Sequence, residues 1–489
     1  MTLLLPSLQA ERIRRSIVDY LSTTFALTDA EPRRVLTDFL QDEEQGVFVG
    51  PFVRLRLPYL AASARPGADP ADRPLDWDPG LTPYQHQEDS YRRLTTKGGH
   101  RPEPTIVTTG TGSGKTESFL HPVLDHVLRA RAQGITGIKA LILYPMNALA
   151  SDQASRLASL ITGDPALAGV RAAIYTGDSS ASPRKHVTAD SLITDRYVIR
   201  DNPPDILLTN YKMLDQLLLR PEDRELWRAS AGSLTYLVLD EFHTYDGAQG
   251  TDVAMLLRRL GLTLRAHLPA DDPRQEAFAS APLGPVCPVA TSATLGDGGD
   301  PSQMLAFARD VFGTDLPASA VVTETRADLD QWAATHRQVA ESKGLDGRAL
   351  RLRSLPAENL QALAHLAETG SPDPEELLRG VVAHLYDLPE EVEDTLDAAG
   401  LASALQAHPD VLDLVRAAEN STPLAALARG LLGPVPESGP ARRVLSAILA
   451  ALSVVRAGLD GKPDRSAVNV EVTLWIREVT RVDRALSSL

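Results

Sequence analysis

One stretch of the chain, TIVTTGTGSGKTESFL (105–120), joins an apolar run, a Gly-rich turn and a helix-forming run. Gly110, Gly112 and Gly114 allow backbone N–H groups to turn inward around phosphate oxygens without a clash from a Cβ atom. The start of the following helix adds a partial positive charge at the same place. The stretch therefore predicts a strand, a phosphate-binding loop and a helix. Lys115 would reach the β- and γ-phosphates of ATP, and Thr116 would bind Mg²⁺.

The loop departs from the strict pattern at one position. A glycine is expected at position 109, and this chain has Thr109. Thr111 and Ser113 complete the loop. Because the strand before it and the helix after it are both in place, we expect residues 109–116 to line the bound nucleotide.

The rest of residues 81–320 alternates short apolar runs with amphipathic runs of helical period. Buried strands that alternate with helices indicate an α/β fold, with a parallel sheet covered on both faces. Ligands of such sheets bind at the carboxyl ends of the strands. The expected strands are 105–109, 140–144, 171–175, 205–209, 236–240 and 286–293.

Two polar groups follow expected strands of this series. Asp240 and Glu241 end the run YLVLD, and His243 comes two residues later. A carboxylate there can hold Mg²⁺, and its neighbour can orient the attacking water. In VATSATLG (289–296), Ser292 and Thr294 follow another apolar run, and their hydroxyls could bridge the nucleotide to a neighbouring segment.

Composition limits the classes of protein that remain. The net charge is −15, so a simple basic nucleic-acid coat protein is excluded, although a local basic groove is not. Cys287 is the only cysteine, which excludes a disulfide framework and a four-cysteine zinc site within the chain. We find no signal peptide and no apolar run long enough to span a bilayer, so we expect a cytoplasmic protein that does not enter a membrane.

We expect three segments along the chain. Residues 1–80 read as two short helices, a strand-like run at 46–60 and a Pro-rich loop, and form a small accessory segment. Residues 81–324 form the nucleotide-binding domain. Residues 325–489 are mostly helical, with a last strand-like run at 467–479.

Several other residues are expected to have structural roles only. Trp77, Trp227, Trp332 and Trp475 are expected to be packing residues, and Cys287 a buried apolar one. His121, His126 and His365 have the spacing of helix-surface histidines.

Taken together, these motifs resemble the first RecA-like domain of superfamily 2 helicases. Residues 109–116 match its motif I, DEFH (240–243) the DExH form of motif II, and SAT (292–294) motif III. Three segments are most similar in sequence to those of large YprA-like and Lhr-like DNA helicases, namely YPMNALA, TNYKMLD and HTYDGAQG. Some relatives with these sequence motifs belong to bacterial anti-phage systems.

The resemblance assigns further roles. In LTPYQHQEDSYRRL (81–94), it implies that Gln87 reads the adenine edge and that Tyr84 packs against the base. It implies that four residues at two loops contact the backbone of a DNA strand: Pro145, Asn147, Thr209 and Asn210. It also implies that His243, Ser292 and Thr294 couple the nucleotide state to those loops.

The chain also departs from such helicases. They need a second RecA-like domain that supplies arginine fingers, and we find no such motif here. The stretch GRALRLR (347–353) follows Thr294 too closely to leave room for the strands that should come before it. We therefore expect the helical block to be an insertion or accessory domain, and a second RecA-like domain or a partner protein to complete the motor.

The first hypothesis is an ATP-dependent DNA helicase or translocase, or its ATP-binding half, in phage defence or DNA repair. ATP and Mg²⁺ would be its cofactors, with weak turnover by this chain alone. The alternatives are a non-catalytic nucleotide- or DNA-binding subunit of a larger complex, and an RNA helicase, because backbone-binding loops carry no readable sugar preference.

Overall fold

The computed structural model describes most of the chain, namely residues 5–24, 29–42, 46–64, 72–110, 112–177, 183–293, 300–345, 347–368, 373–389, 396–433, 438–459 and 461–477. It divides into two compact units. One unit comprises Leu60–Thr325, and the other joins Met1–Tyr59 to Arg326–Leu489. None of the described helices is both long and apolar enough to cross a lipid bilayer.

The unit of residues 60–325 is built on a seven-stranded parallel sheet with the strand order β4-β5-β3-β6-β7-β2-β8. This confirms the α/β fold expected from the alternating pattern. All six expected strands are present, with ends that differ from the expected ones by at most one residue. The strands are β2 (Thr105–Thr108), β3 (Ala140–Tyr144), β4 (Ala172–Tyr175), β5 (Ile206–Asn210), β6 (Tyr236–Leu239), β7 (Cys287–Ser292) and β8 (Val321–Thr323).

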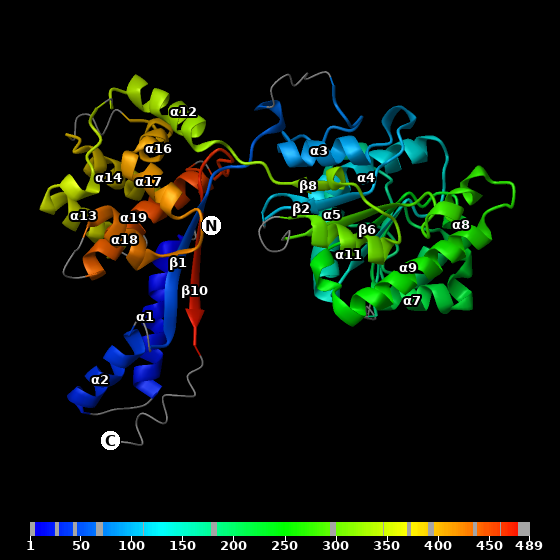
Figure 1. Cartoon of the computed structure of the whole chain (residues 1–489), viewed down its shortest axis with the longest axis horizontal. Helices are drawn as coiled ribbons and strands as arrows, with labels where there is room; N and C mark the ends of the chain where they lie inside the picture. Colours follow the sequence, from blue (N-terminus) through cyan, green and yellow to red (C-terminus); the bar gives the residue numbers. More distant parts are fainter. Residues whose placement is uncertain are drawn as a thin grey trace. The chain divides into compact units, whose positions relative to one another are not determined.

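Helices cover both faces of this sheet (Figure 1). The helices of the unit are α3 (Gln85–Leu94), α4 (Lys115–Ala132), α5 (Asn147–Gly163), α6 (Arg196–Asp201), α7 (Tyr211–Leu219), α8 (Arg224–Ser230), α9 (Gly247–His267), α10 (Ala277–Ser280) and α11 (Ser302–Phe312).

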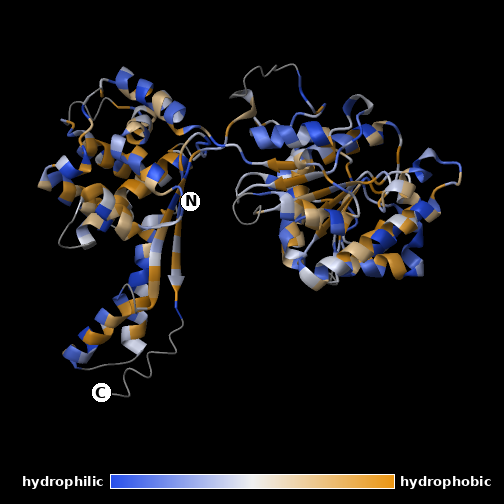
Figure 2. Ribbon diagram, viewed as in Figure 1, coloured by the Kyte–Doolittle hydropathy of each residue, from blue (hydrophilic) through white to orange (hydrophobic). Residues whose placement is uncertain are grey.

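The alternation of side chains along each strand divides the core into two clusters. In β3, Ile142 packs with residues of α3, α4 and α5 on one face of the sheet. Its neighbours Leu141 and Leu143 pack on the other face, with residues of α7, α8, α9 and α11. Figure 2 shows the strands as a mostly apolar layer between helices that are more polar on their outer sides. Both faces are thus sealed, and the edge at the carboxyl ends of the strands remains for a site.

The other unit contains a three-stranded antiparallel sheet and a helical bundle. Its strands have the order β10-β1-β9, with β1 (Phe48–Arg56), β9 (Thr422–Pro423) and β10 (Asn469–Ile476). Its helices are α1 (Pro6–Thr24), α2 (Ala30–Gln41), α12 (Leu329–Ser342), α13 (Ala357–Glu368), α14 (Pro374–Tyr386), α16 (Ala398–Ala407), α17 (Pro409–Ala417), α18 (Leu424–Leu432) and α19 (Ser438–Ala457). The block after residue 325 is therefore mostly helical, as its composition indicates.

The division into units differs from the three segments expected from the sequence. The first 59 residues do not stand alone, because β1 pairs along its length with β10 near the other end of the chain. Residues 60–80, expected in the accessory segment, belong to the parallel-sheet unit. The backbone N–H groups of Asp76 and Trp77 both donate to the carboxylate of Asp125 in α4, at 2.9 and 2.8 Å, which ties this segment to the sheet unit.

Two expectations, one for a tryptophan and one for a histidine, were wrong. Trp475 is 63% exposed, because it lies on the edge strand β10, whereas Trp77, Trp227 and Trp332 are buried as expected. His121 is buried instead of lying on a helix surface, and its Nδ1 is 2.8 Å from the hydroxyl of Tyr91. The helix α4 is covered on several sides, so helical spacing alone does not identify an exposed face.

Candidate nucleotide site

The Gly-rich loop follows β2 and ends where α4 begins. Gly112 and Gly114 have φ angles of +73° and +78°, in the left-handed region that favours glycine. Gly114 is also the N-cap of α4, and a Cβ atom there would lie 2.2 Å from Nε2 of Gln87. Left-handed residues can turn neighbouring backbone N–H groups toward one side, as anion-binding loops require. Thr111 lies outside the described residues.

Hydrogen bonds within the loop and to its neighbours hold it in place. The hydroxyls of Thr109 and Ser113 are 2.6 Å apart, so they close the loop on itself. Nε2 of His86 lies 2.9 Å from the carbonyl oxygen of Ser113. The backbone N–H of Thr109 donates to the carbonyl of Ser292 at the end of β7, at 3.3 Å. The loop is thus pre-shaped by its neighbours.

The sheet brings the expected acidic pair to this loop. Nζ of Lys115 lies 3.9 Å from Oε1 of Glu241. Asp240 is buried at the end of β6, and burial raises the pKa of its carboxyl group, an effect that a hydrogen bond from the hydroxyl of Thr291 partly offsets. Thr116 is the second residue of α4 and is partly buried.

Glu241 has an unusual backbone. Its φ and ψ are both 49°, and among the described residues only Asp387 is another non-glycine at positive φ. Such a conformation costs roughly 1–2 kcal/mol. It persists because its surroundings hold it: the Glu241 N–H donates to Oγ1 of Thr291 at 3.2 Å. Strain of this kind gathers at functional sites.

His243 and Ser292 meet beside the acidic pair. Nδ1 of His243 is 3.5 Å from Oε2 of Glu241 and 3.3 Å from Oγ of Ser292. The structure therefore places Lys115, Glu241, His243 and Ser292 in one connected group. Thr294 lies outside the described residues.

The donor set fits ATP with Mg²⁺. Mg²⁺ usually binds through one or two carboxylates, waters and phosphates of the substrate, with oxygen ligands throughout. Asp240 supplies a carboxylate and Thr116 a hydroxyl. No group of three or more His, Cys, Asp or Glu side chains in the described ranges could hold a metal ion by itself.

Comparison with known proteins identifies the part of the chain that carries this site. The DEAD/DEAH box helicase family model matches residues 84–296. Those residues form a DEAD/DEAH box helicase domain. The match begins at Tyr84, the N-cap of α3, and ends four residues after Ser292. The resemblance to superfamily 2 helicases is thereby confirmed.

Curated relatives, among them proteins named as helicases, also match part of the chain. "Druantia protein DruE" of Escherichia coli (strain UMEA 4076-1) is 27% identical in an alignment 332 positions long that covers 48% of this chain and 17% of the relative. "Uncharacterized ATP-dependent helicase YprA" of Bacillus subtilis (strain 168) is 32% identical over 36% of this chain and 20% of its own. "ATP-dependent helicase hrq1" of Schizosaccharomyces pombe is 30% identical, over 36% and 14%. The chain thus spans a fifth or less of these relatives' lengths.

Among solved structures, "Crystal Structure of DUF1998 helicase MrfA bound to DNA" is similar at 22% identity, with a TM-score of 0.39. The similarity covers 60% of this chain and 36% of that one.

The segment expected to read adenine lies at the start of α3 in the helicase domain. Tyr84 and Gln87 are both buried. Oε1 of Gln87 accepts from the N–H of Tyr84 at 2.9 Å, and its Nε2 donates to the carbonyl of Gly114 at 3.2 Å. Gln87 therefore closes the start of its own helix through Oε1 and connects α3 to the Gly-rich loop through Nε2.

The expected nucleic-acid residues lie at the ends of β3 and β5, which are neighbours in the sheet. Asn210 donates from Nδ2 to Oδ1 of Asn147 at 2.6 Å, so the two loops are tied together. Pro145 and Asn147 are partly exposed. Thr209 is different: it is fully buried, and its hydroxyl donates to the carbonyl of Tyr175 at 2.6 Å. The structure thus presents three of the four residues at this edge.

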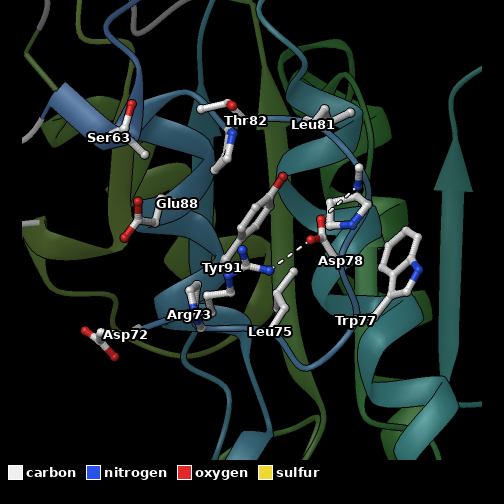
Figure 3. Close-up of a pocket in the computed structure, with 15 residues that line it drawn as sticks. Ser63, Asp72, Arg73, Leu75, Trp77, Asp78, Leu81, Thr82, Glu88 and Tyr91 are labelled. Carbon is white, nitrogen blue, oxygen red and sulfur yellow. Dashed lines mark hydrogen bonds and ion pairs between the residues drawn. The ribbon is translucent and has the colours of Figure 1, made fainter. Parts of the chain in front are cut away.

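A separate cavity of about 520 Å³ lies beside α3 (Figure 3). Trp77, Leu81 and Tyr91 line it, and Arg73 pairs with Asp78 at 2.9 Å beside them. Its lining contains neither Gln87 nor any residue of the Gly-rich loop. The cavity therefore adjoins the segment 81–94 without being part of the group around Lys115.

Sequence reasoning missed three residues of the site. His86 is adjacent to Gln87, and Thr291 directly precedes the SAT motif, so position beside a motif was an available signal for both. No sequence signal points to Glu324. Its Oε2 accepts from the N–H of Gly110 at 2.7 Å, although 214 residues separate the two.

Proposed function

We propose that the chain is the ATP-binding part of an ATP-dependent DNA helicase or translocase. One observation carries the proposal: a pre-shaped phosphate loop and the pair Asp240–Glu241 meet at Lys115, within a DEAD/DEAH box helicase domain. A loop of this shape without a nearby carboxylate would suggest binding alone. The carboxylate of Glu241, a residue whose backbone is strained, lies 3.9 Å from the loop lysine and supports hydrolysis.

Each residue has a defined task in this proposal. Lys115 neutralises phosphate charge, and the loop N–H groups donate to phosphate oxygens. Thr116 and Asp240 would hold Mg²⁺, which would neutralise developing charge on the phosphates when bound. Glu241 orients the attacking water. His243 and Ser292 link Glu241 to β7, so they can transmit the state of the site to neighbouring loops.

The nucleic-acid surface would be the edge formed by Pro145, Asn147 and Asn210. The hydrogen bond between the two asparagines gives this edge one shape across two strands. DNA is favoured over RNA because the motif sequences resemble those of YprA-like and Lhr-like DNA helicases, and a helicase named YprA matches 36% of the chain. A role in phage defence is suggested by the relative named Druantia protein DruE. The single cysteine favours a reducing, cytoplasmic location.

A second RecA-like domain or a partner protein would complete the motor. In the described part of the unit that contains residues 326–477, the sheet is three-stranded and antiparallel, with β1 from the start of the chain at its centre, unlike the parallel sheet of a RecA-like domain. Two of the three arginines of the stretch 347–353 are engaged elsewhere: Arg351 pairs with Asp410 and Asp413 at 2.9 and 2.6 Å, and Arg353 donates to the carbonyl of Leu431. An arginine finger contributes roughly 10³ to 10⁵ in rate in related enzymes, so turnover by this chain alone would be slow.

The proposal is tested by binding measurements. Wild type should bind a fluorescent ATP analogue more tightly with Mg²⁺ than without, and Lys115→Ala should lose most of this affinity. Binding to single-stranded DNA and RNA of equal length, at matched salt, tests the choice of nucleic acid. Failure of the wild type to bind nucleotide would contradict an ATP-dependent function, and tighter binding to RNA would favour an RNA helicase.

A further inference from the structure

A carboxylate already contacts the phosphate loop. Oε2 of Glu324 accepts a hydrogen bond from the backbone N–H of Gly110 at 2.7 Å. The sheet explains the contact. The strands β2 and β8 are parallel neighbours in which Thr108 is opposite Thr323, so Gly110 and Glu324 both follow the carboxyl end of a strand. The side chain of Glu324 reaches across that edge to the loop.

The chemistry of this contact resembles that of the expected ligand. A carboxylate oxygen and a phosphate oxygen are both anionic acceptors of backbone N–H groups. Glu324 therefore supplies a negative charge from within the chain at the loop that should receive the phosphates. When phosphates enter, two anionic groups would share one small region, and their repulsion favours departure of one of them. The Glu324 side chain is the group that would leave, because the loop is also held by Ser292, His86 and its own hydroxyls.

The contact of Glu324 lies next to the boundary between the two units in the sequence. Glu324 is the first residue after β8, and Thr325 is the last residue of the parallel-sheet unit. The carbonyl of Thr325 accepts from the N–H of Leu60, which is the first residue of that unit, at 2.8 Å. The end of β8 is thus linked to both points at which the chain passes from one unit to the other.

We propose that Glu324 is an internal competitor of the nucleotide for the Gly-rich loop. Nucleotide phosphates displace its carboxylate from Gly110, and the released end of β8 reports occupancy of the site to residues 324–326. Without nucleotide, the contact gives the Gly110 N–H an acceptor, and it lowers the affinity of the loop for nucleotide. This inference rests on the proposed function, since it needs ATP or ADP in the loop.

Two variants separate competition from simple support of the loop. Glu324→Gln removes the charge and keeps an acceptor, whereas Glu324→Ala removes both. If Glu324 competes, Glu324→Ala should bind a fluorescent ADP or ATP analogue about 10-fold more tightly than wild type, and Glu324→Gln should also bind more tightly. If Glu324 only supports the loop, Glu324→Ala should bind more weakly. Glu103→Gln is the matched control, because Glu103 precedes β2 and pairs with Arg93 at 2.9 Å.

Hydrogen exchange gives a second readout. Nucleotide should increase amide exchange over residues 321–325 in wild type, and that segment should already exchange faster in Glu324→Ala without nucleotide. Equal or weaker nucleotide binding by Glu324→Ala overturns the inference while wild type still binds in a Lys115-dependent way. A wild type that binds no nucleotide overturns the proposed function and the inference with it.

Discussion

The hydroxyl of Thr291 donates a hydrogen bond to the carboxylate of Asp240. The same oxygen accepts the N–H of Glu241, the residue with the strained backbone. One buried hydroxyl on β7 therefore fixes both acidic residues at the end of β6. A valine would fill the same space without either hydrogen bond.

Thr291→Val should therefore lower ATP hydrolysis about 10- to 100-fold, whereas Thr291→Ser should stay close to wild type. The loss of a hydrogen bond to a buried charged group costs about 1.5–3 kcal/mol. The control is Thr108→Val, because Thr108 is also buried but donates to the carbonyl of Val322, away from the carboxylates. Equal hydrolysis by the valine and serine variants of Thr291 would refute a role for the hydroxyl.

Gly114→Ala should damage the phosphate loop more than Gly112→Ala. Both positions have positive φ, so both substitutions carry backbone strain. Only at Gly114 would the new Cβ meet a neighbour, Nε2 of Gln87 at 2.2 Å, whereas nothing lies within 4 Å at Gly112. We expect a melting temperature lower by about 2–4 °C for Gly114→Ala than for Gly112→Ala, and weaker nucleotide binding. Identical melting curves for the two variants would show that the contact with Gln87 is unimportant.

Asn147→Ala and Asn210→Ala should separate the nucleic-acid edge from helix stability. The Oδ1 of Asn210 also accepts from the N–H of Met213 at 2.8 Å and so caps α7. Asn210→Ala should cost about 1 kcal/mol of stability and weaken binding to single-stranded DNA. Asn147→Ala should weaken DNA binding with little change in stability. Fluorescence anisotropy at fixed salt measures the binding, with exposed Asn202→Ala as the control. Unchanged DNA binding by both variants would remove this edge from the interface.

Acid should destabilise the helicase domain through two histidines. Burial lowers the pKa of His121 and of His126 from 6.5 to about 4. A base with a depressed folded pKa contributes stability that is complete above the unfolded pKa of 6.5 and is lost as the pH falls from there toward 4. Each histidine should lower the free energy of unfolding by about 2 kcal/mol when the pH falls from 7 to 5.

Chemical denaturation followed by tryptophan fluorescence checks this, since Trp77 packs edge-on against His121 at 5.4 Å. His121→Gln should lose less stability than wild type over that pH range. The exposed His186→Gln should behave as wild type. A His121→Gln variant that is as acid-sensitive as wild type would argue against titration of this histidine.

The parallel sheet and the three motifs were predictable from sequence because each is local. A run such as ALILY (140–144) is apolar on both faces, and only a strand covered on both sides needs that composition. The strand β8 was missed because three residues, VVT, carry too little pattern, and their strand character depends on pairing with β2.

What sequence could not predict depends on neighbours in space. The contact of Glu324 with Gly110 arises from the order β2-β8 in the sheet, and the hydroxyl of Thr291 reaches Asp240 because β7 lies beside β6. The pairing of β1 with β10 joins segments from opposite ends of the chain, and no local signal links them. The roles of the individual motif residues remain predictions until they are tested by substitution.

The central claim is that Glu241, held beside Lys115, makes the helicase domain an ATP hydrolase that works on DNA. Steady-state ATP hydrolysis by wild type and Glu241→Gln, with and without single-stranded DNA, tests it most directly. We predict slow hydrolysis that single-stranded DNA stimulates, and that Glu241→Gln abolishes while it still binds ATP. Hydrolysis that persists in Glu241→Gln, or a wild type that binds ATP and never hydrolyses it even with DNA and a chain supplying the second RecA-like domain, would contradict the claim.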